Sequence, residues 1–400
     1  MDSKKELIFR SIYKTGFVIA FCLSMGVCGP FGFSGGMIIA LISAVFLNIT
    51  PDTLISPMLT EFLILSFAAS RTGAAGAIAV TVPGVIIMLA VSRSDKFRKI
   101  ITESGLPGII SLFTALAVTI LVTNTYFGIG ASGDTVIDML RSYRSLGFHP
   151  NWRGILYGTI VMVIMITFPR KFKKAKNIMN MAFAAIVITY ILNLLLTLKT
   201  LPVPFEEAGG FTGKLFDFTL RLNGINIFII IISALAFGIT AAVSLPGKTG
   251  IPACAGTAVS AAASSVFGCA VTTEGNSIPS GYISGIISAA AAGLIFIVTK
   301  GFARLPAASC AVVLIVAAWQ SLDKPSIKLA FKGGRAVASA LIILAALASN
   351  PAPAVLLPVA IELIKAAGKP SENEEKDDVN KETEDKDKEA EDKEEAEAEE

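Results

Sequence analysis

The stretch CAVTTEGNSIPSG at 269–281 interrupts long apolar sequence on both of its sides and carries the acidic residue Glu274. A charged side chain at the centre of a bilayer costs about 2.5–3.5 kcal/mol or more, so an ionisable residue in such a run marks a functional site by default. The Thr, Gly, Asn and Pro residues around Glu274 predict a helix that is broken at this point, because broken membrane helices expose polar backbone ends.

The rest of the chain is apolar enough for a membrane protein. Of its 400 residues 53% are hydrophobic, and the mean hydropathy is +0.68, which is high for a soluble protein with a charged surface. Residues 371–400 contain 17 acidic and five basic residues, whereas the body before them is basic. With almost no apolar side chains, this acidic tail is predicted to be disordered.

Apolar segments of near-spanning length form two groups of seven, separated by the polar residues 199–223. An odd number of segments gives the two halves inverted topology, as in transporters whose site lies at the repeat interface. The sequence therefore predicts an all-α membrane protein of about 14 transmembrane segments, with a first repeat at 1–198, an extracytoplasmic linker at 199–223, a second repeat at 224–368 and a cytoplasmic tail at 369–400. The segments lie at about 11–28, 36–50, 53–70, 72–92, 106–124, 153–168 and 177–198, and then at about 224–244, 250–268, 270–281, 282–299, 306–320, 336–349 and 351–366.

The third and the tenth segments carry matching interruptions. SPMLTEF at 56–62 places Glu61 about 51 residues after the first segment begins near Arg10, and TTEGNSIP at 272–279 places Glu274 about 50 residues after the eighth begins near Gly224. Thr-Glu thus recurs at equivalent places, and both segments are predicted to be short and broken. The candidate substrate-binding residues are Ser56, Pro57, Thr60, Glu61, Thr273, Glu274, Gly275, Asn276 and Ser277.

The basic residues predict the topology. With a cytoplasmic N-terminus, the inner loops carry 18 Lys and Arg residues and the outer loops carry nine. The positive-inside rule then places both termini on the cytoplasmic side of the membrane. We expect that membrane to be a bacterial-type plasma (inner) membrane. Because these cations are spread over short loops, no nucleic-acid binding is expected. Segment 134–147 is predicted to be an interfacial helix on the outer side, capped by Asp134, with Val136, Met139, Leu140 and Tyr143 on one face.

Four stretches carry a resemblance to a known transporter family: GPFGFSGG at 29–36, ISP at 55–57, NWRGILYGTIVMVIMITFPRKFKK at 151–174 and, most closely, LPAASCAVVLIVAAWQSLD at 305–323. These stretches resemble parts of the SulP-type anion permeases. The first is similar to the start of that family's second helix, and the second to the Gly-Pro pair of its third helix. The third is similar to its sixth helix with a basic end, and the fourth to its Ile-Pro-x-Ala-x-Leu-Ala stretch ending in Ala-Trp. The resemblance runs over most of residues 10–350. It implies seven-plus-seven inverted repeats, a mobile core of segments 1–4 and 8–11, and a gate domain of segments 5–7 and 12–14. It also implies short strands and half-helices in segments 3 and 10, with the N-termini of the half-helices toward the substrate.

The chain departs from the SulP pattern in three places. Glu274 and Asn276 stand where the family usually has a basic residue in segment 10, segment 8 lacks the usual acidic residue, and the acidic tail follows in place of a STAS domain. The Glu in segment 10 is more like that of the nucleobase and ascorbate permeases.

The sequence indicates a secondary transporter of a small anion (sulfate-, bicarbonate- or carboxylate-like) or polar solute. The alternatives are a nucleobase-type permease and a non-transporting membrane scaffold whose tail recruits partners.

A half-helix N-terminus offers N–H groups and about half a positive charge to an anion. Glu274 would compete with the anion for that charge unless it were protonated, which favours H⁺ coupling, and Na⁺ held between Glu274 and backbone carbonyls is the second option. In the opposing interpretation, Glu61 and Glu274 are hydrogen-bonded helix caps without a role in transport.

No enzyme activity, metal site or other cofactor is expected. The sequences GIGASG at 128–133 and GFSGG at 32–36 have the residue spacing of known enzyme motifs but lack the structural context that these motifs need. His149, the single histidine, lies in a predicted polar loop. A homodimer is compatible with the sequence.

Overall fold

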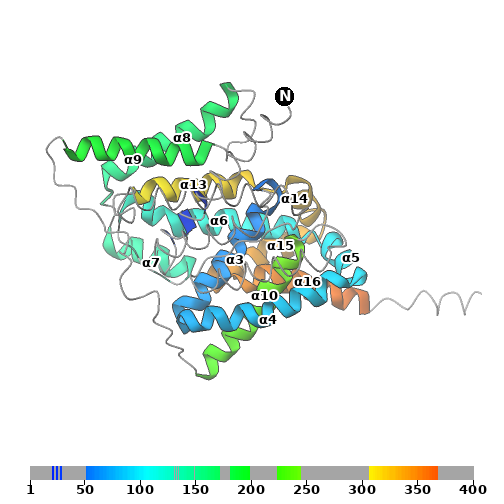
Figure 1. The fold of residues 1–400 in the computed structure, drawn as a ribbon. Helices are drawn as coiled ribbons and strands as arrows, with labels where there is room; N and C mark the ends of the chain where they lie inside the picture. The colour runs from blue at the N-terminus through cyan, green and yellow to red at the C-terminus, as the bar shows by residue number, and fades with distance from the viewer. Residues whose placement is uncertain are drawn as a thin grey trace, which may run out of the picture. The chain divides into compact units, whose positions relative to one another are not determined.

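The computed structural model describes residues 20, 21, 24, 25, 28, 51–129, 131, 133, 135–147, 149–171, 181–198, 223–244 and 306–367. Beyond the few residues before 51, these ranges contain twelve helices and no strand (Figure 1). The helices are α3 (Pro51–Thr72), α4 (Ala74–Arg93), α5 (Asp95–Glu103), α6 (Leu106–Phe127), α7 (Val136–Leu146), α8 (Trp152–Lys171), α9 (Ala182–Leu198), α10 (Gly224–Ser244), α13 (Ala307–Gln320), α14 (Lys324–Ala330), α15 (Arg335–Ala348) and α16 (Ala352–Ala367).

Nine predicted segments coincide with helices of the structure: those now seen as α3, α4, α6, α8, α9, α10, α13, α15 and α16. The other five predicted segments lie wholly or mostly outside the described residues, so the 14-segment count and the inverted repeat stay predictions. The domain boundaries at 198, 223 and 368 also stay predictions.

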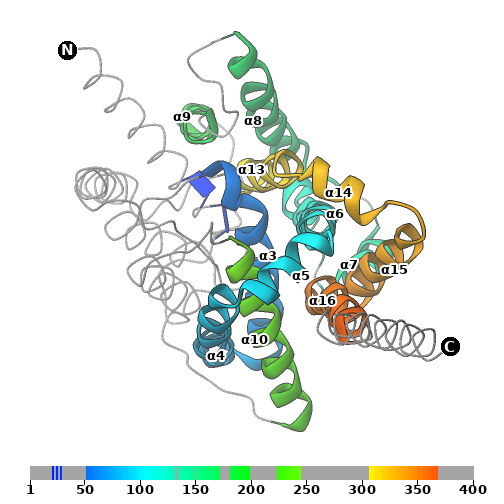
Figure 2. The same ribbon diagram turned by 90° about the vertical axis from the view of Figure 1, so that its right-hand side faces the viewer.

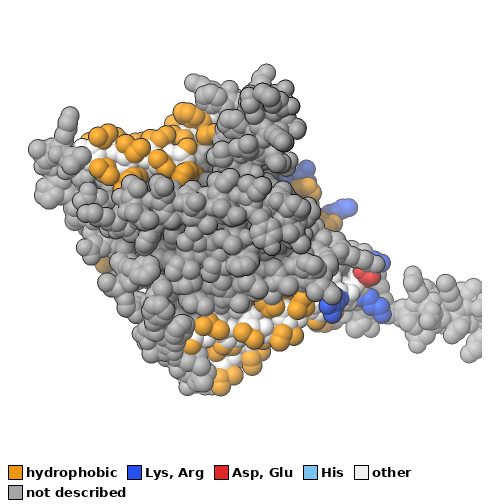
Figure 3. Space-filling view, viewed as in Figure 1, with side chains coloured by type: hydrophobic (Ala, Val, Ile, Leu, Met, Phe, Trp, Pro, Cys, Tyr) orange, Lys and Arg blue, Asp and Glu red, His pale blue; other side chains and the backbone are white. Residues whose placement is uncertain are grey.

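The helices have the length and surface of membrane spans. Ala75–Arg93, Leu106–Phe127 and Gly224–Val243 are long and apolar enough to cross a bilayer, since about 20 residues at 1.5 Å per residue span roughly 30 Å. Large apolar side chains are exposed on several helices, among them Ile86, Leu195, Phe228 and Leu341 at 57–63%, and Figure 3 shows such surfaces on one face. Lipid covers apolar surface of this kind, so the chain is an integral membrane protein.

One group of described helices consists of α3, α4 and α10, which pack against one another. Figures 1 and 2 show α4 and α10 side by side. Their backbones approach closely at two glycines: a Cβ on Gly84 would lie 2.6 Å from Cδ1 of Phe237, and a Cβ on Gly238 would lie 2.5 Å from the carbonyl oxygen of Gly84. Small residues that allow close backbone approach are the common device of helix packing in membranes.

A second group surrounds α6, which packs against α8, α13, α14 and α15. Side-chain hydrogen bonds join its members: Trp319 Nε1 on α13 donates to Thr119 Oγ1 on α6 at 2.8 Å, and Ser339 Oγ on α15 donates to the carbonyl of Ala330 on α14 at 2.8 Å. Tyr157 on α8 likewise donates to Asn193 Oδ1 on α9 at 3.2 Å.

The two groups meet where α3 packs against α6 and α13. By chain order, α3, α4 and α10 correspond to segments that the SulP resemblance assigns to the core, and α6, α8, α9, α13 and α15 to segments that it assigns to the gate. We call the two sets the core helices and the gate helices, with α14 among the latter. The α3–α6 contact is therefore the boundary between them.

Two sequence predictions were wrong in detail. Segment 3 is not short and broken, because α3 runs unbroken through Pro57 for 22 residues. Proline removes only one helical hydrogen bond, and neighbours in a membrane sustain the helix around it; α3 has such neighbours in α4, α6 and α10. The cap of α7 is Thr135 rather than Asp134, since Thr135 Oγ1 accepts the Asp138 N–H at 3.1 Å.

The chain divides into two compact units, Met1–Pro358 and Val359–Glu400. The described part of the second unit is the end of α16, where Lys365 Nζ contacts Glu362 Oε1 at 2.8 Å. The residues of the candidate site and the cavity described below belong to the first unit.

Candidate functional site

Helix α3 carries the described half of the predicted site. Ser56, Thr60 and Glu61 are buried, with 7%, 0% and 0% of their surface exposed. Because α3 begins at Pro51, Glu61 lies in the middle of the helix and not near a half-helix N-terminus. The predicted residues of segment 10, Thr273, Glu274, Gly275, Asn276 and Ser277, lie outside the described residues.

Thr60 ties α3 to α6. Its Oγ1 donates to the carbonyl of Ser56 at 2.9 Å and lies 2.6 Å from Thr114 Oγ1. Each hydroxyl has a single hydrogen, so both contacts are satisfied when Thr114 donates to Thr60. The bond lies on the boundary between core and gate helices.

Glu61 has no hydrogen-bond partner among the residues that the structure describes, at either carboxyl oxygen. At helical spacing Leu65, Ala68 and Thr72 share its face of α3, and all three are fully buried. That face is therefore packed inside the protein and does not face lipid. Among the described residues Glu61 caps no helix, because it lies in the middle of α3 and has no partner there; the capping interpretation with respect to segment 10 stays a prediction.

The surroundings of Glu61 contain no compensating charge in the described helices. The helices packed against α3 are α4, α6, α10 and α13. Arg93, the last residue of α4, is their one charged residue, and Tyr126 on α6 and Cys310 on α13 are their other titratable groups. Burying an ionised carboxylate without a partner costs several kcal/mol. An ionised Glu61 would therefore need a cation or hydrogen-bond donors from outside the described helices.

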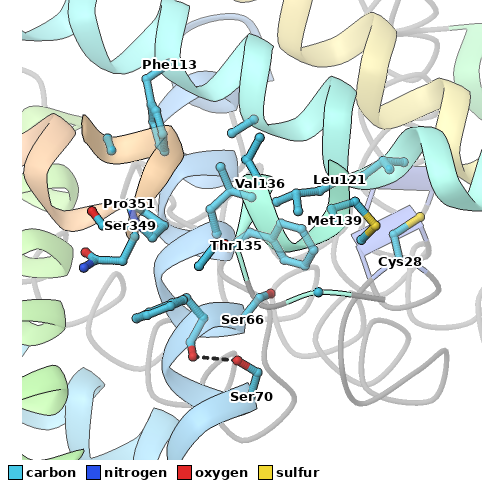
Figure 4. Close-up of a pocket in the computed structure, with 18 of the residues that line it drawn as sticks. Cys28, Ser66, Ser70, Phe113, Leu121, Thr135, Val136, Met139, Ser349 and Pro351 are labelled. Atoms are coloured by element: carbon cyan, nitrogen blue, oxygen red, sulfur yellow. Dashed lines mark hydrogen bonds between the residues drawn. The ribbon is translucent and has the colours of Figure 1, made fainter. Parts of the chain in front are cut away.

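A cavity of about 480 Å³ lies beside the second half of α3. It is bounded by α3, α6, α7 and the turn between α15 and α16 (Figure 4). Aromatic and sulfur-bearing side chains line much of it, among them Phe62, Phe67, Phe113, Met139 and Cys28. Since α3 is a core helix and the other elements adjoin the gate, the cavity lies on the same boundary as the Thr60–Thr114 bond.

Neutral polar groups give the cavity its hydrogen-bonding capacity: Ser66, Ser70, Thr135, Ser349 and Asn350. Ser70 Oγ donates to the carbonyl of Phe67 at 2.9 Å (Figure 4). The lining contains no charged side chain among the described residues. Hydroxyl and amide groups of this kind can hold a small polar solute in a mainly apolar pocket.

The sequence analysis did not single out these cavity residues. Phe62, Ser66 and Ser70 follow at four-residue intervals on α3, which places them on one helical face, and this spacing is a signal that could have been read. Thr135 and Asn350 reach the cavity only through tertiary packing. No periodicity in the chain connects them with α3.

No protein-family model matches the chain, and no curated protein matches it significantly. Solved structures do match. The transmembrane domain of a cyanobacterium bicarbonate transporter, BicA, has a TM-score of 0.58 and 17% identity, covering 91% of this chain and 97% of that one. The murine Solute Carrier 26 family member A9 (Slc26a9) anion transporter, in its inward-facing state, has a TM-score of 0.54 and 10% identity over 90% of this chain and 68% of that one. A second structure of SLC26A9 has a TM-score of 0.52 and 11% identity, and the match covers 89% of this chain and 65% of that one.

These likenesses define the class of protein: a helical integral membrane protein with the fold of the SLC26/SulP anion transporters. The SulP resemblance in the sequence is thus supported at the level of the fold. At 10–17% identity, the likeness covers the fold alone.

Proposed function

We propose that this protein is a secondary active transporter that moves a small anion, or another small polar solute, across the membrane by alternating access. The observation that carries the proposal is the cavity between α3 and the gate helices, in a chain that shares its fold with a bicarbonate transporter and with SLC26A9. A solute held at that boundary would change sides when α3 and its core partners move against α6.

The packing supports such a movement. Close glycine contacts hold α4 to α10, and hydrogen bonds hold α6 to α13 and α14 to α15, so each group is tied internally. Between the groups, α3 meets α6 through mostly apolar side chains and a pair of hydroxyls at Thr60 and Thr114. Small shifts between well-packed bodies are the usual form of such transitions.

Glu61 supplies a candidate for coupling to H⁺ or Na⁺. Its side chain leans toward the N-terminal end of α3, as helical side chains do, and therefore toward the turn of Pro57. Proline has no N–H, so the carbonyl of Thr53 lacks its usual helical donor. Carboxyls and freed carbonyls in broken or distorted helices hold the coupling ions of many transporters. Glu274 remains the sequence-based candidate in segment 10.

Two other functions remain as alternatives and differ in what they predict. A nucleobase-type permease would carry a neutral ring compound, which the three phenylalanines of the cavity could stack against. A non-transporting scaffold would move no solute at all.

The deciding experiment is uptake into proteoliposomes that contain the full-length protein, with labelled bicarbonate, sulfate, fumarate and uracil. Uptake of one of the three anions above that of empty vesicles supports anion transport. Uptake of uracil alone supports the permease, and uptake of none contradicts transport of these solute classes.

The cavity itself can be tested through Cys28, which lines it and is half-buried. In a variant that keeps only this cysteine, a small anionic methanethiosulfonate reagent should modify Cys28 and inhibit uptake, and the transported solute should slow the modification. The matched control keeps only Cys310, which is fully buried and should react slowly. Modification that the solute leaves unchanged would place the cavity off the solute path.

A further inference from the structure

The end of the molecule opposite the cavity carries a surface of basic side chains. It consists of Arg93, Lys96, Lys99, Lys324, Lys328, Lys332 and Arg335, which we call the basic surface; all are exposed except the half-buried Arg335. Their segments are distant in sequence, but both adjoin the first turn of α6. There, α5 leads directly into Gly105, and a Cβ on Gly108 would lie 2.3 Å from the backbone of Ser326 on α14. The cavity lies farther along α6, beside Phe113, Ala117, Leu121 and Val122.

The cations of this surface outnumber the acids near them. The acidic residues of the same segments are Asp95, Glu103 and Asp323. Asp323 is already engaged, since its carboxylate accepts the N–H of Ser326 at 3.2 Å and the Ser326 hydroxyl at 2.6 Å. The surface therefore presents a net positive charge.

Both short helices of the surface have the form of interfacial helices. The axis of α14 is bent by 63° from that of α13, so α14 turns away from the direction of the span. Its outward face carries Lys324, Lys328 and the exposed Leu329, while Ala330 is buried. On α5, Lys96 and Lys99 are exposed while Ile101 is buried. Short helices of this kind lie at the level of the lipid headgroups.

Exposed apolar stripes run from the basic surface into the membrane-spanning region. On α15 the stripe is Val337, Leu341 and Leu344, each at least 60% exposed, and on α4 it is Val82 and Ile86, at 56% and 63%. In Figure 3 an apolar surface gives way to Lys and Arg side chains, with an acidic side chain among them, near where Figure 1 labels α5. A cationic surface at the end of an apolar stripe matches the two parts of a phospholipid: an anionic headgroup and an acyl chain.

We infer that the basic surface on α5, α14 and the start of α15 binds the headgroups of anionic phospholipids in the adjacent leaflet. The lysine ammonium groups contact the lipid phosphates, and the stripes on α4 and α15 contact the acyl chains. A soluble acidic partner would meet the basic side chains but not the stripes, which lie within the bilayer. Each Lys near an anionic membrane surface contributes measurably to such an attraction, and the attraction weakens as salt screens it.

The test compares lipid binding by full-length protein and by two matched double variants. Lys324→Gln with Lys328→Gln removes two exposed cations from the basic surface. Arg144→Gln with Arg153→Gln removes two exposed cations from α7 and α8, at the other end of α6. Native mass spectrometry of the detergent-solubilised protein, titrated with dioleoylphosphatidylglycerol or dioleoylphosphatidylcholine, measures the affinity for each lipid. Thermal unfolding in phosphatidylcholine alone verifies that both variants fold.

We expect the wild type to prefer phosphatidylglycerol and the α14 double variant to bind it on the order of 10-fold more weakly. The control variant should keep the wild-type preference, and added salt should reduce binding of phosphatidylglycerol only. Equal binding of the two lipids by the wild type, or an equal loss in both variants, would overturn the inference. Displacement of phosphatidylglycerol by millimolar inorganic phosphate would overturn it as well, because the surface would then be a site for a soluble anion.

Discussion

The hydroxyl oxygens of Thr60 on α3 and Thr114 on α6 lie 2.6 Å apart, and both residues are fully buried. The two threonines are 54 positions apart in the chain. The bond joins a core helix to a gate helix one residue before Glu61, so any sliding of α3 against α6 must break or exchange it. The pair therefore holds the conformation seen in the structure.

Replacing Thr60 with valine keeps the shape of the side chain and removes this bond. We expect a loss of about 0.5–1.5 kcal/mol in the stability of the observed conformation, the usual net contribution of one hydrogen bond, and a changed rate of solute exchange at equilibrium. Thermal unfolding and exchange of labelled solute in proteoliposomes measure the two effects. Thr81→Val is the control, because the buried Thr81 hydroxyl donates within its own helix, to Ala77 at 2.9 Å. An unchanged exchange rate in Thr60→Val would show that the bond does not restrain the movement.

The glycine contact between α4 and α10 predicts a larger effect on folding. In Gly238→Ala the new methyl would lie 2.5 Å from the carbonyl oxygen of Gly84 and 2.7 Å from Cβ of Ile87, so the helices must separate, at a cost of about 1–3 kcal/mol. Gly224→Ala at the start of the same helix meets nothing within 4 Å and should leave the unfolding temperature nearly unchanged. Equal unfolding temperatures for the two variants would contradict the close packing of α4 and α10.

The sequence predicted the helices well because apolar length alone indicates a membrane span. It located α3 and Glu61 but misjudged the local structure, since Pro57 and the polar residues near it suggested a break that packing against α10, α4 and α6 prevents. The cavity was beyond prediction for a different reason. It joins Ser66 to Thr135 and Asn350, and contacts across such distances in the chain depend on tertiary packing.

The two ends of α6 allow a test of the predicted topology. Lys96 on α5 and Arg144 on α7 are both exposed, and their helices adjoin opposite ends of α6. A cysteine at position 144 should react with an impermeant maleimide added outside intact cells, and a cysteine at position 96 should react only after the cells are opened, because the basic end is predicted to face the cytoplasm. The reverse pattern would invert the orientation, and reaction of both from outside would exclude α6 as a span.

The last prediction concerns Glu61. Glu61→Gln keeps the size of the side chain and imitates the protonated carboxyl, so the protein should fold and exchange labelled solute, since burial of a neutral amide costs far less than burial of a charge. If Glu61 carries the coupled proton, accumulation driven by a pH gradient should disappear in the variant. For each proton coupled, a gradient of one pH unit drives accumulation of up to about 10-fold in the wild type.

The comparison uses solute uptake by wild type, Glu61→Gln and Glu274→Gln, each with an imposed pH gradient and then with an imposed Na⁺ gradient. Glu362→Gln is the control, because its carboxylate pairs with Lys365 within α16 and belongs to the second compact unit of the chain. A Glu61→Gln variant that still concentrates solute under both gradients would exclude Glu61 as the coupling group. A loss confined to the Na⁺ gradient would point to Na⁺ as the coupling ion at Glu61, because Gln keeps an oxygen ligand but removes the negative charge that balances the bound cation.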